Sequence, residues 1–292
     1  MTAALLYQPT RRLEDIEHLG AYFETPQLIA AIATERMGSL NQTIVAEPVY
    51  CDGSWGVWSP SAVVQRDPQT IIVDSTLLGR EDGVADLLVR LPPAATVLRI
   101  HSGLKLFQQG LELADVGIVT AYSQEATKAS ATADALRKLR SITGLGLGFA
   151  EIAALELPVF LDPTPTKSFE DAVFSNNARL ASAVSENNLL FEPIVHPSLL
   201  AKVAKAPYCT FRLRRPSGAA YERLQIAIAK TIRDMNLLVA NAGSFGFRGH
   251  RFEIVRPENG APFLRVALGC RAGRSLEGVI AMMRGLAGRA EL

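Results

Sequence analysis

The chain has 292 residues, of which 48% are hydrophobic, and its formal net charge is +1. This length accommodates one large domain or two modest ones, and the balanced charge gives no electrostatic basis for binding nucleic acid. Its cysteines, Cys51, Cys209 and Cys270, are odd in number and lack zinc-site spacing, so we expect reduced thiols in a cytoplasmic protein.

The N-terminal stretch MTAALLYQPTRR does not have the order of a signal peptide, because its short apolar run precedes the basic pair. No uninterrupted apolar segment has the length of a membrane span. We therefore expect no association with a membrane.

Residues 1–165 predict an α/β domain with a largely parallel sheet, because almost continuously apolar runs alternate with helical segments. The expected strands are at 43–50, 96–101 and 115–122, with a further buried strand that runs into a loop at 70–79. The expected helices are at 28–38, 83–91 and 123–144.

The helix expected at 123–144 begins at its cap candidate, Ser123, carries Leu136 in its apolar stripe and ends at Gly144. The sequence TGLGLG at 143–148 follows it. Because no strand leads into these glycines and their spacing differs from a dinucleotide fingerprint, they predict a loop. A nucleotide-dependent enzyme is therefore disfavoured.

The segment LDPTPTKS at 161–168 predicts a boundary between domains, residues 1–165 and 166–292, with Ser168 capping the first helix of the second. Beyond residue 190 the pattern is that of a small α+β domain. Its expected strands are at 208–214, 237–247, 251–256 and 262–269, and its expected helices are at 220–236 and 275–288.

Asp74 ends one apolar strand, and Lys105 follows the next. Because consecutive parallel strands end at the same edge of a sheet, a carboxylate and an amine are expected to face one crevice. Such an amine forms a Schiff base with a carbonyl, and such a carboxylate keeps a ring nitrogen protonated. Taken singly, a solvated lysine and a turn-capping aspartate explain the same residues.

Arg265 lies within the strand FLRVAL, where alternation puts Leu264, Val266 and Leu268 on one face and Arg265 on the other. An arginine in so apolar a strand needs an anionic partner. Two partners fit: a substrate carboxylate gripped bidentately, or a glutamate in a structural ion pair.

Six segments, in their order along the chain, resemble those of fold-type I pyridoxal-phosphate enzymes. They are IIVDST, HSGLK, GLELADVGIV, NNARLASAVSE, HPSL and SFGF…PFLRVALG. The similarity lies between the cysteine/methionine-metabolism lyases and the class I/II aminotransferases. It implies that Lys105 binds the cofactor through a Schiff base and that Asp74 pairs with the pyridine nitrogen. It also implies that Ser102 contacts the phosphate and Arg265 the substrate α-carboxylate. His101 is expected either to pack or to contact the cofactor.

Only residues 1–42 precede the strand expected at 43–50, and they contain no glycine-rich turn of the kind that holds the phosphate in this family. We expect a second polypeptide to supply these elements, or a homo-oligomer. A shortened enzyme and a non-catalytic interaction or scaffold subunit are the alternatives. The expected substrate is an amino acid, undergoing elimination, replacement or transamination.

Overall fold

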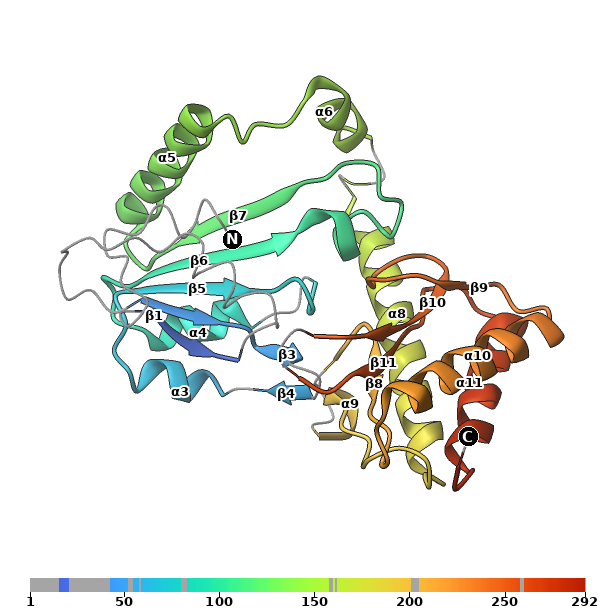
Figure 1. The fold of residues 1–292 in the computed structure, drawn as a ribbon. Helices are drawn as coiled ribbons and strands as arrows, with labels where there is room; N and C mark the ends of the chain where they lie inside the picture. Colours follow the sequence, from blue (N-terminus) through green and yellow to red (C-terminus); the bar gives the residue numbers. More distant parts are fainter. Residues whose placement is uncertain are drawn as a thin grey trace. The chain divides into compact units, whose positions relative to one another are not determined.

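The computed structural model describes residues 16–20, 43–51, 55–57, 59–79, 83–157, 160, 162–200, 205–257 and 260–291 (Figure 1). The chain divides into two compact units. Unit 1 comprises Met1–Asp52, Gly56–Leu104 and Leu113–Leu161, and unit 2 comprises Gly53–Trp55, Lys105–Glu112 and Asp162–Leu292. The helix expected at 28–38 lies outside the described residues.

Unit 1 is built on a five-stranded sheet of order β1-β2-β5-β6-β7. Its strands are β1 (Ile16–Leu19), β2 (Thr43–Ala46), β5 (Thr70–Asp74), β6 (Thr96–Ser102) and β7 (Gly117–Tyr122). The first four are parallel, and β7 runs antiparallel to β6. The predicted α/β fold with a largely parallel sheet is therefore confirmed.

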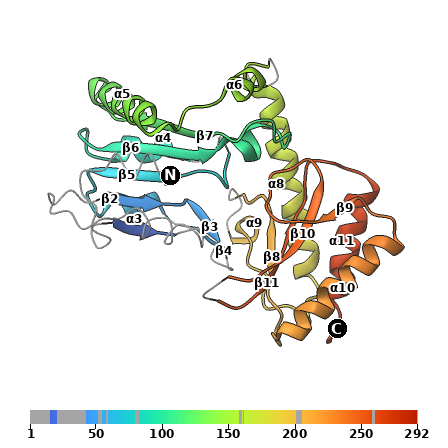
Figure 2. The same ribbon diagram turned by 45° about the horizontal axis from the view of Figure 1, so that its top comes forward.

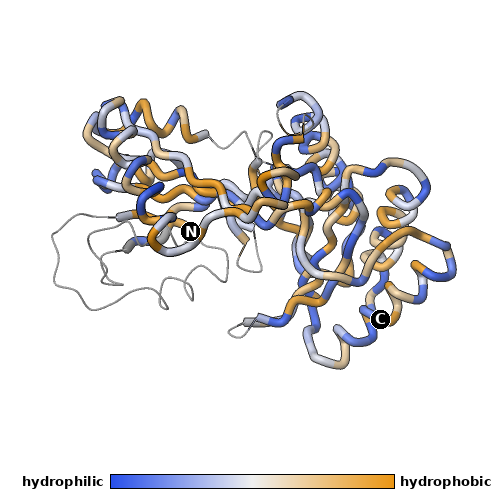
Figure 3. The backbone as a smooth tube through the Cα atoms, turned by 90° about the horizontal axis from the view of Figure 1, so that it is seen from above, coloured by the Kyte–Doolittle hydropathy of each residue, from blue (hydrophilic) through white to orange (hydrophobic). Residues whose placement is uncertain are grey.

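Both faces of this sheet are covered by helices (Figure 2). On one face, α3 (Pro60–Val64) and α4 (Val84–Arg90) pack against alternate strand residues such as Ile71 and Val97. On the other, Leu136 of α5 (Ala126–Thr143) joins Ile72, Leu98 and Ile100. Burial from both sides explains why hydrophobic stretches run along these strands without a polar alternation (Figure 3).

Helix α5 starts later than expected, because Glu125 is its N-cap and the Ser123 hydroxyl accepts a hydrogen bond from the Glu125 N–H outside the helix. Its expected end is correct, since Gly144 adopts the left-handed conformation there (φ 69°). A further short helix, α6 (Phe149–Leu155), was not predicted. The strands β3 (Val49–Cys51) and β4 (Trp55–Val57) form a separate two-stranded sheet.

Unit 2 contains a four-stranded sheet of order β8-β11-β10-β9. These strands are β8 (Cys209–Phe211), β11 (Phe263–Ala267), β10 (His250–Val255) and β9 (Val239–Asn241). The helices α8 (Pro163–Ser185), α10 (Gly218–Asp234) and α11 (Arg274–Ala287) share one hydrophobic core with the sheet, and α9 (Pro197–Leu200) is a single turn.

The alternation predicted for β11 is correct, because Leu264, Val266 and Leu268 all belong to the core that the helices share. Arg265 therefore lies on the sheet face that points away from this core. The polar residues of the candidate site are found on that face.

Helix α8 begins earlier than the sequence predicts, and Ser168 lies inside it rather than at its cap. Asp162 is the N-cap, its side chain accepts a hydrogen bond from the Thr164 N–H, and Pro163 is the first helical residue. Proline fits this position because its missing N–H has no helical partner there.

No helix in the described part of the chain combines the length and apolar character needed to cross a bilayer.

Candidate active site

Asp74 and Ser102 come together at the carboxyl ends of the neighbouring strands β5 and β6. Thr76 links them, because its N–H donates to Asp74 Oδ1 at 2.9 Å and its Oγ1 accepts from the Ser102 N–H at 3.0 Å. The Ser102 hydroxyl takes no part in this link. Strand alternation puts both side chains on the face of Ile72 and Ile100, with His101 on the opposite face.

Burial raises the pKa of the Asp74 carboxyl above its usual range, and the two hydrogen bonds with Thr76 partly oppose this effect. The shift arises because a carboxylate loses solvation when it is enclosed by protein. A cationic N–H donor placed against Asp74 would stabilise the ionised form. The site therefore suits a protonated ring nitrogen.

Lys105 lies in a kinked segment, Gly103–Phe107, that continues directly from β6. Its backbone departs from helical geometry (φ −82°, ψ −108°). Lys105 follows Ser102 by three positions in the sequence.

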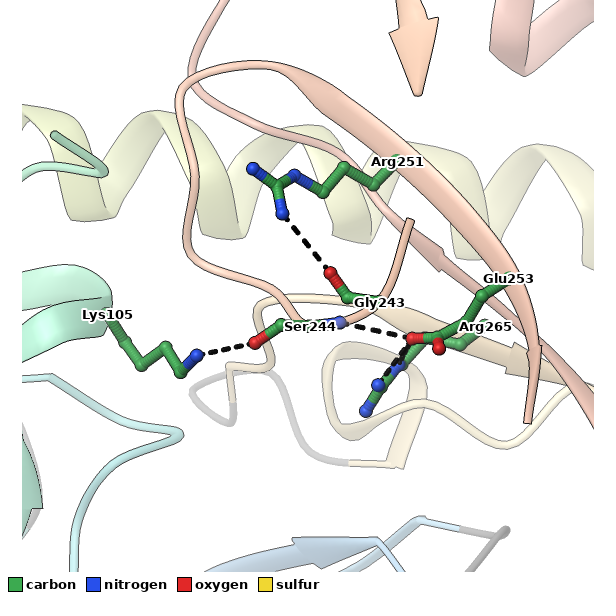
Figure 4. A network of polar contacts seen from close by, with 6 residues as sticks. All are labelled: Lys105, Gly243, Ser244, Arg251, Glu253 and Arg265. Carbon is green, nitrogen blue, oxygen red and sulfur yellow. Dashed lines mark hydrogen bonds and ion pairs between the residues drawn. The ribbon is translucent and has the colours of Figure 1, made fainter. Parts of the chain in front are cut away.

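The Lys105 amine belongs to unit 2, where its Nζ donates a hydrogen bond to Ser244 Oγ at 2.5 Å (Figure 4). The same atom lies 5.8 Å from the centre of the Phe245 ring and 5.3 Å from that of Phe247. Aromatic rings at these distances attract a cation. The amine is thus held by one hydroxyl and two rings from a single loop.

That loop has an unusual backbone, because Ser244 adopts a positive φ of 72° and Gly246 one of 77°. A side chain at Gly246 would put its Cβ 3.3 Å from the Lys105 Cβ, so glycine permits the close approach of the two segments. Positive φ is uncommon for serine and is maintained only where the surroundings enforce it.

Arg265 forms a part-buried ion pair with Glu253, which faces it on the adjacent antiparallel strand β10. The Arg265 Nε donates to Glu253 Oε1 at 2.7 Å, and the guanidinium lies 5.4 Å from the centre of the Tyr208 ring. Of the two anionic partners that the sequence left open, a glutamate is present in this structure. The predicted contact with a substrate carboxylate stays a prediction.

Glu253 also connects Arg265 to the lysine, because its Oε1 accepts a hydrogen bond from the Ser244 N–H at 3.2 Å. Lys105, Ser244, Glu253 and Arg265 therefore form one continuous polar network (Figure 4). The structure joins two of the predicted site residues, Lys105 and Arg265, in unit 2, and two others, Asp74 and Ser102, in unit 1.

Sequence reasoning missed Thr76, Ser244, Glu253 and Tyr208. One local signal was available: Ser244 stands in GSFGF, between glycines that mark an irregular turn. Glu253 had none, because its partner depends on the register between β10 and β11. Among the described residues, no group of three or more histidine, cysteine, aspartate or glutamate side chains is arranged to bind a metal.

A scan against protein-family models finds no match to this sequence, and a search of curated proteins finds none either. Solved structures do match. The methionine γ-lyase CalE6 from Micromonospora echinospora superposes with a TM-score of 0.65 at 15% identity, covering 99% of this chain and 78% of that one. A putative O-acetylhomoserine (thiol)-lyase from Campylobacter jejuni, which carries N'-pyridoxyl-lysine-5'-monophosphate, gives 0.65 at 15% identity, covering 98% and 79%.

A tyrosine aminotransferase from Leishmania infantum matches with a TM-score of 0.59 at 13% identity, covering all of this chain and 72% of that one. These neighbours are pyridoxal-phosphate-dependent lyases and aminotransferases. The chain therefore has the fold of the fold-type I pyridoxal-phosphate enzymes, as its sequence motifs predict.

Proposed function

We propose that this chain is a subunit of a pyridoxal-phosphate-dependent enzyme that acts on an amino acid, and that Lys105 holds the cofactor. One observation carries the proposal. Lys105, which follows β6 directly, has its amine held by the Ser244 hydroxyl and by two aromatic rings, and the chain has the fold of these enzymes. A solvated loop lysine would not be held in this way.

The residues at the ends of β5 and β6 fit the same cofactor. The half-buried Asp74 carboxyl suits the protonated pyridine nitrogen, because a cationic donor would offset the loss of solvation that raises its pKa. The Ser102 hydroxyl, three residues before Lys105, suits a phosphate oxygen. We keep His101 as a prediction only, since alternation puts it on the opposite face of the sheet from Asp74.

When bound, the protonated ring of pyridoxal phosphate supplies an electron sink for the substrate α-carbon. The chain's own residues then have three tasks. Lys105 takes a proton from the α-carbon and returns one, Ser244 orients the lysine amine, and Arg265 binds the substrate carboxylate. Elimination, replacement and transamination all use this arrangement, and the lyase and aminotransferase neighbours represent these classes.

A second chain, either another polypeptide or a second copy of this one, is proposed to supply the remaining cofactor contacts. Mass measurement in solution, for the chain alone and with proteins encoded beside it, tests this part. A chain that stays monomeric while binding the cofactor at full occupancy would exclude it.

The cofactor proposal is tested by loading the chain with pyridoxal phosphate and recording its visible absorbance. We expect a band that is absent in Lys105→Ala, and borohydride reduction followed by peptide mapping should place the pyridoxyl group on Lys105. Lys205→Ala is the matched control, because Lys205 also lies over an aromatic ring, 5.7 Å from the centre of Phe174, and pairs with Asp171.

The control variant should keep both the band and the label on Lys105. Labelling spread over several lysines, or an unchanged band in Lys105→Ala, would overturn the proposal. A chain that never binds the cofactor, alone or with its partners, would be a non-catalytic subunit instead.

A further inference from the structure

Glu253 binds the Arg265 guanidinium, which is the group proposed to bind the substrate carboxylate. Glu253 Oε1 accepts from Arg265 Nε at 2.7 Å and also lies against Arg265 Nη2. The guanidinium has five N–H donors, and Glu253 takes those on its Nε–Nη2 edge. A second carboxylate would therefore either share Arg265 with Glu253 or displace it.

Sharing Arg265 between two carboxylates is unfavourable here. The Arg265 side chain is only 8% exposed, and the Tyr208 ring lies beside it. Two carboxylates around one guanidinium leave a net negative charge, and a poorly solvated environment increases the cost of that charge. Exchange of one carboxylate for the other avoids this cost.

The two partners differ in their access to water. The Glu253 side chain is 23% exposed, against 8% for Arg265. Glu253 thus has a route to solvent if it leaves the pair, whereas Arg265 remains enclosed. This asymmetry favours exchange at Arg265 over a permanent structural ion pair.

We propose that Glu253 is a built-in occupant of the carboxylate site on Arg265, and that a substrate carboxylate binds there only by releasing Glu253. The inference rests on the proposed function and makes Glu253 a specificity-determining residue of the same site. Competition with Glu253 therefore lowers the affinity for ligands that have a carboxylate, and it does not affect ligands without one.

Release of Glu253 would also affect Lys105, because Ser244 connects the two residues. Glu253 Oε1 holds the Ser244 N–H at 3.2 Å, and the Ser244 hydroxyl holds the Lys105 amine at 2.5 Å. When Glu253 leaves, Ser244 loses its acceptor, so arrival of a carboxylate at Arg265 weakens the hold on Lys105.

The first test uses acetate as the probe and the chain without cofactor. Acetate is titrated while the NMR signal of the Arg265 Nε–Hε group is followed in the wild type and in Glu253→Gln. Glutamine keeps the shape and the acceptor for Ser244 but removes the charge. We expect acetate to bind Glu253→Gln at least about tenfold more tightly, the effect of one charge-assisted hydrogen bond.

Glu112→Gln is the matched control, because Glu112 pairs with Arg251 in the same unit through a more exposed contact of 3.4 Å. It should leave the affinity for acetate unchanged. Equal affinities in the wild type and Glu253→Gln would overturn the inference, and so would an equal gain in Glu112→Gln.

The second test uses the cofactor-loaded chain and two reagents, aminooxyacetate and O-methylhydroxylamine, which share the reactive aminooxy group and differ by a carboxylate. The ratio of their apparent affinities, read from the loss of visible absorbance, isolates the contribution of the carboxylate. We expect this ratio to rise at least about tenfold in Glu253→Gln and the rise to disappear when Arg265→Lys is added.

An unchanged ratio in Glu253→Gln overturns the inference while leaving the proposed function intact. Conversely, if the chain binds no cofactor but acetate still prefers Glu253→Gln, the proposed function fails and the competition at Arg265 stands.

Discussion

The Lys105 amine and the Ser244 hydroxyl are joined by a hydrogen bond of 2.5 Å, although the two residues lie 139 positions apart in the sequence. Ser244 makes this contact from a backbone with positive φ, and its N–H is held by Glu253. A serine side chain in this conformation costs free energy, so the loop maintains it against the local preference of the residue. The relationship points to a positioning role for Ser244.

Two substitutions at Ser244 separate the hydroxyl from the backbone. Both Ser244→Gly and Ser244→Ala remove the hydrogen bond to Lys105, but only glycine relieves the positive φ. We expect the glycine variant to be about 1 kcal/mol more stable than the alanine variant in urea unfolding. We also expect the two variants to show the same change in the pH dependence of the visible absorbance of the cofactor-loaded chain.

A variant that keeps a hydroxyl at this position provides the control. Ser244→Thr should retain the pH dependence of the wild type more closely than alanine does. If all three variants titrate like the wild type, Ser244 does not position the lysine.

Asp74→Asn should stabilise the chain without cofactor at neutral pH. Burial raises the folded-state pKa of Asp74 above its ordinary value of 3.8. Its contribution to stability is therefore fully present below pH 3.8 and is lost as pH rises through the folded-state pKa. Asparagine avoids this loss and keeps the oxygen that accepts from Thr76, so the gain in Tm should shrink as pH falls toward 3.8.

Pyridoxal phosphate should stabilise the wild type more than Asp74→Asn, because asparagine offers no charge to a protonated ring nitrogen. The increase in Tm on adding the cofactor should thus be smaller in Asp74→Asn than in the wild type. Asp86→Asn, an exposed position in α4, serves as control. A larger cofactor-induced increase in Asp74→Asn would remove Asp74 from the site.

Local patterns explain what the sequence predicted correctly. Period-two alternation needs only a few neighbouring residues, so it assigned Arg265 to the correct face of β11. The continuous apolar runs predicted the parallel strands, because strands buried on both faces lack polar alternation. They also predicted the strand ends that carry Asp74 and Ser102.

Contacts between distant segments escaped prediction for an equally physical reason. The pairing of Glu253 with Arg265 follows from the register of β10 and β11, and the contact of Ser244 with Lys105 follows from the path of a loop. Helix starts were misplaced where two caps compete: Asp162 with a following proline prevails over Ser168 because proline is preorganised for the first helical position.

Asn177→Ala should destabilise unit 2 by about 3 kcal/mol, because it leaves buried backbone groups without partners. The Asn177 amide of α8 donates to the Leu268 carbonyl at 2.8 Å and accepts from the Leu268 N–H at 3.0 Å. These bonds fix the end of the strand that carries Arg265. The midpoint of urea unfolding measures the effect.

The neighbouring Asn176 offers a comparison within the same helix, since its side chain makes one such bond, to the Gly269 carbonyl at 2.8 Å. Asn176→Ala should cost clearly less than Asn177→Ala. Equal losses in the two variants would contradict the assignment of a special role to Asn177.

His196 should make the chain less stable in mild acid. Burial lowers its pKa to about 4 from an ordinary 6.5, so the folded state keeps the ring neutral while the unfolded state takes up a proton. The stabilisation is complete above pH 6.5 and is lost as pH falls toward 4, by about 3 kcal/mol in all. His196→Asn keeps an acceptor for the Ser198 hydroxyl, which lies 2.7 Å from His196 Nδ1, and has no proton to gain.

Urea unfolding of both proteins at several values between pH 4 and pH 7 isolates this contribution. The pKa of His250 is also lowered by burial, but His250 is present in both proteins and cancels in the difference. The asparagine variant should be the less stable protein at pH 7, because it loses the contact of the His196 ring with Trp55. The gap should close as pH falls, and parallel curves across this range would show that the pKa of His196 is the same in the folded and the unfolded chain.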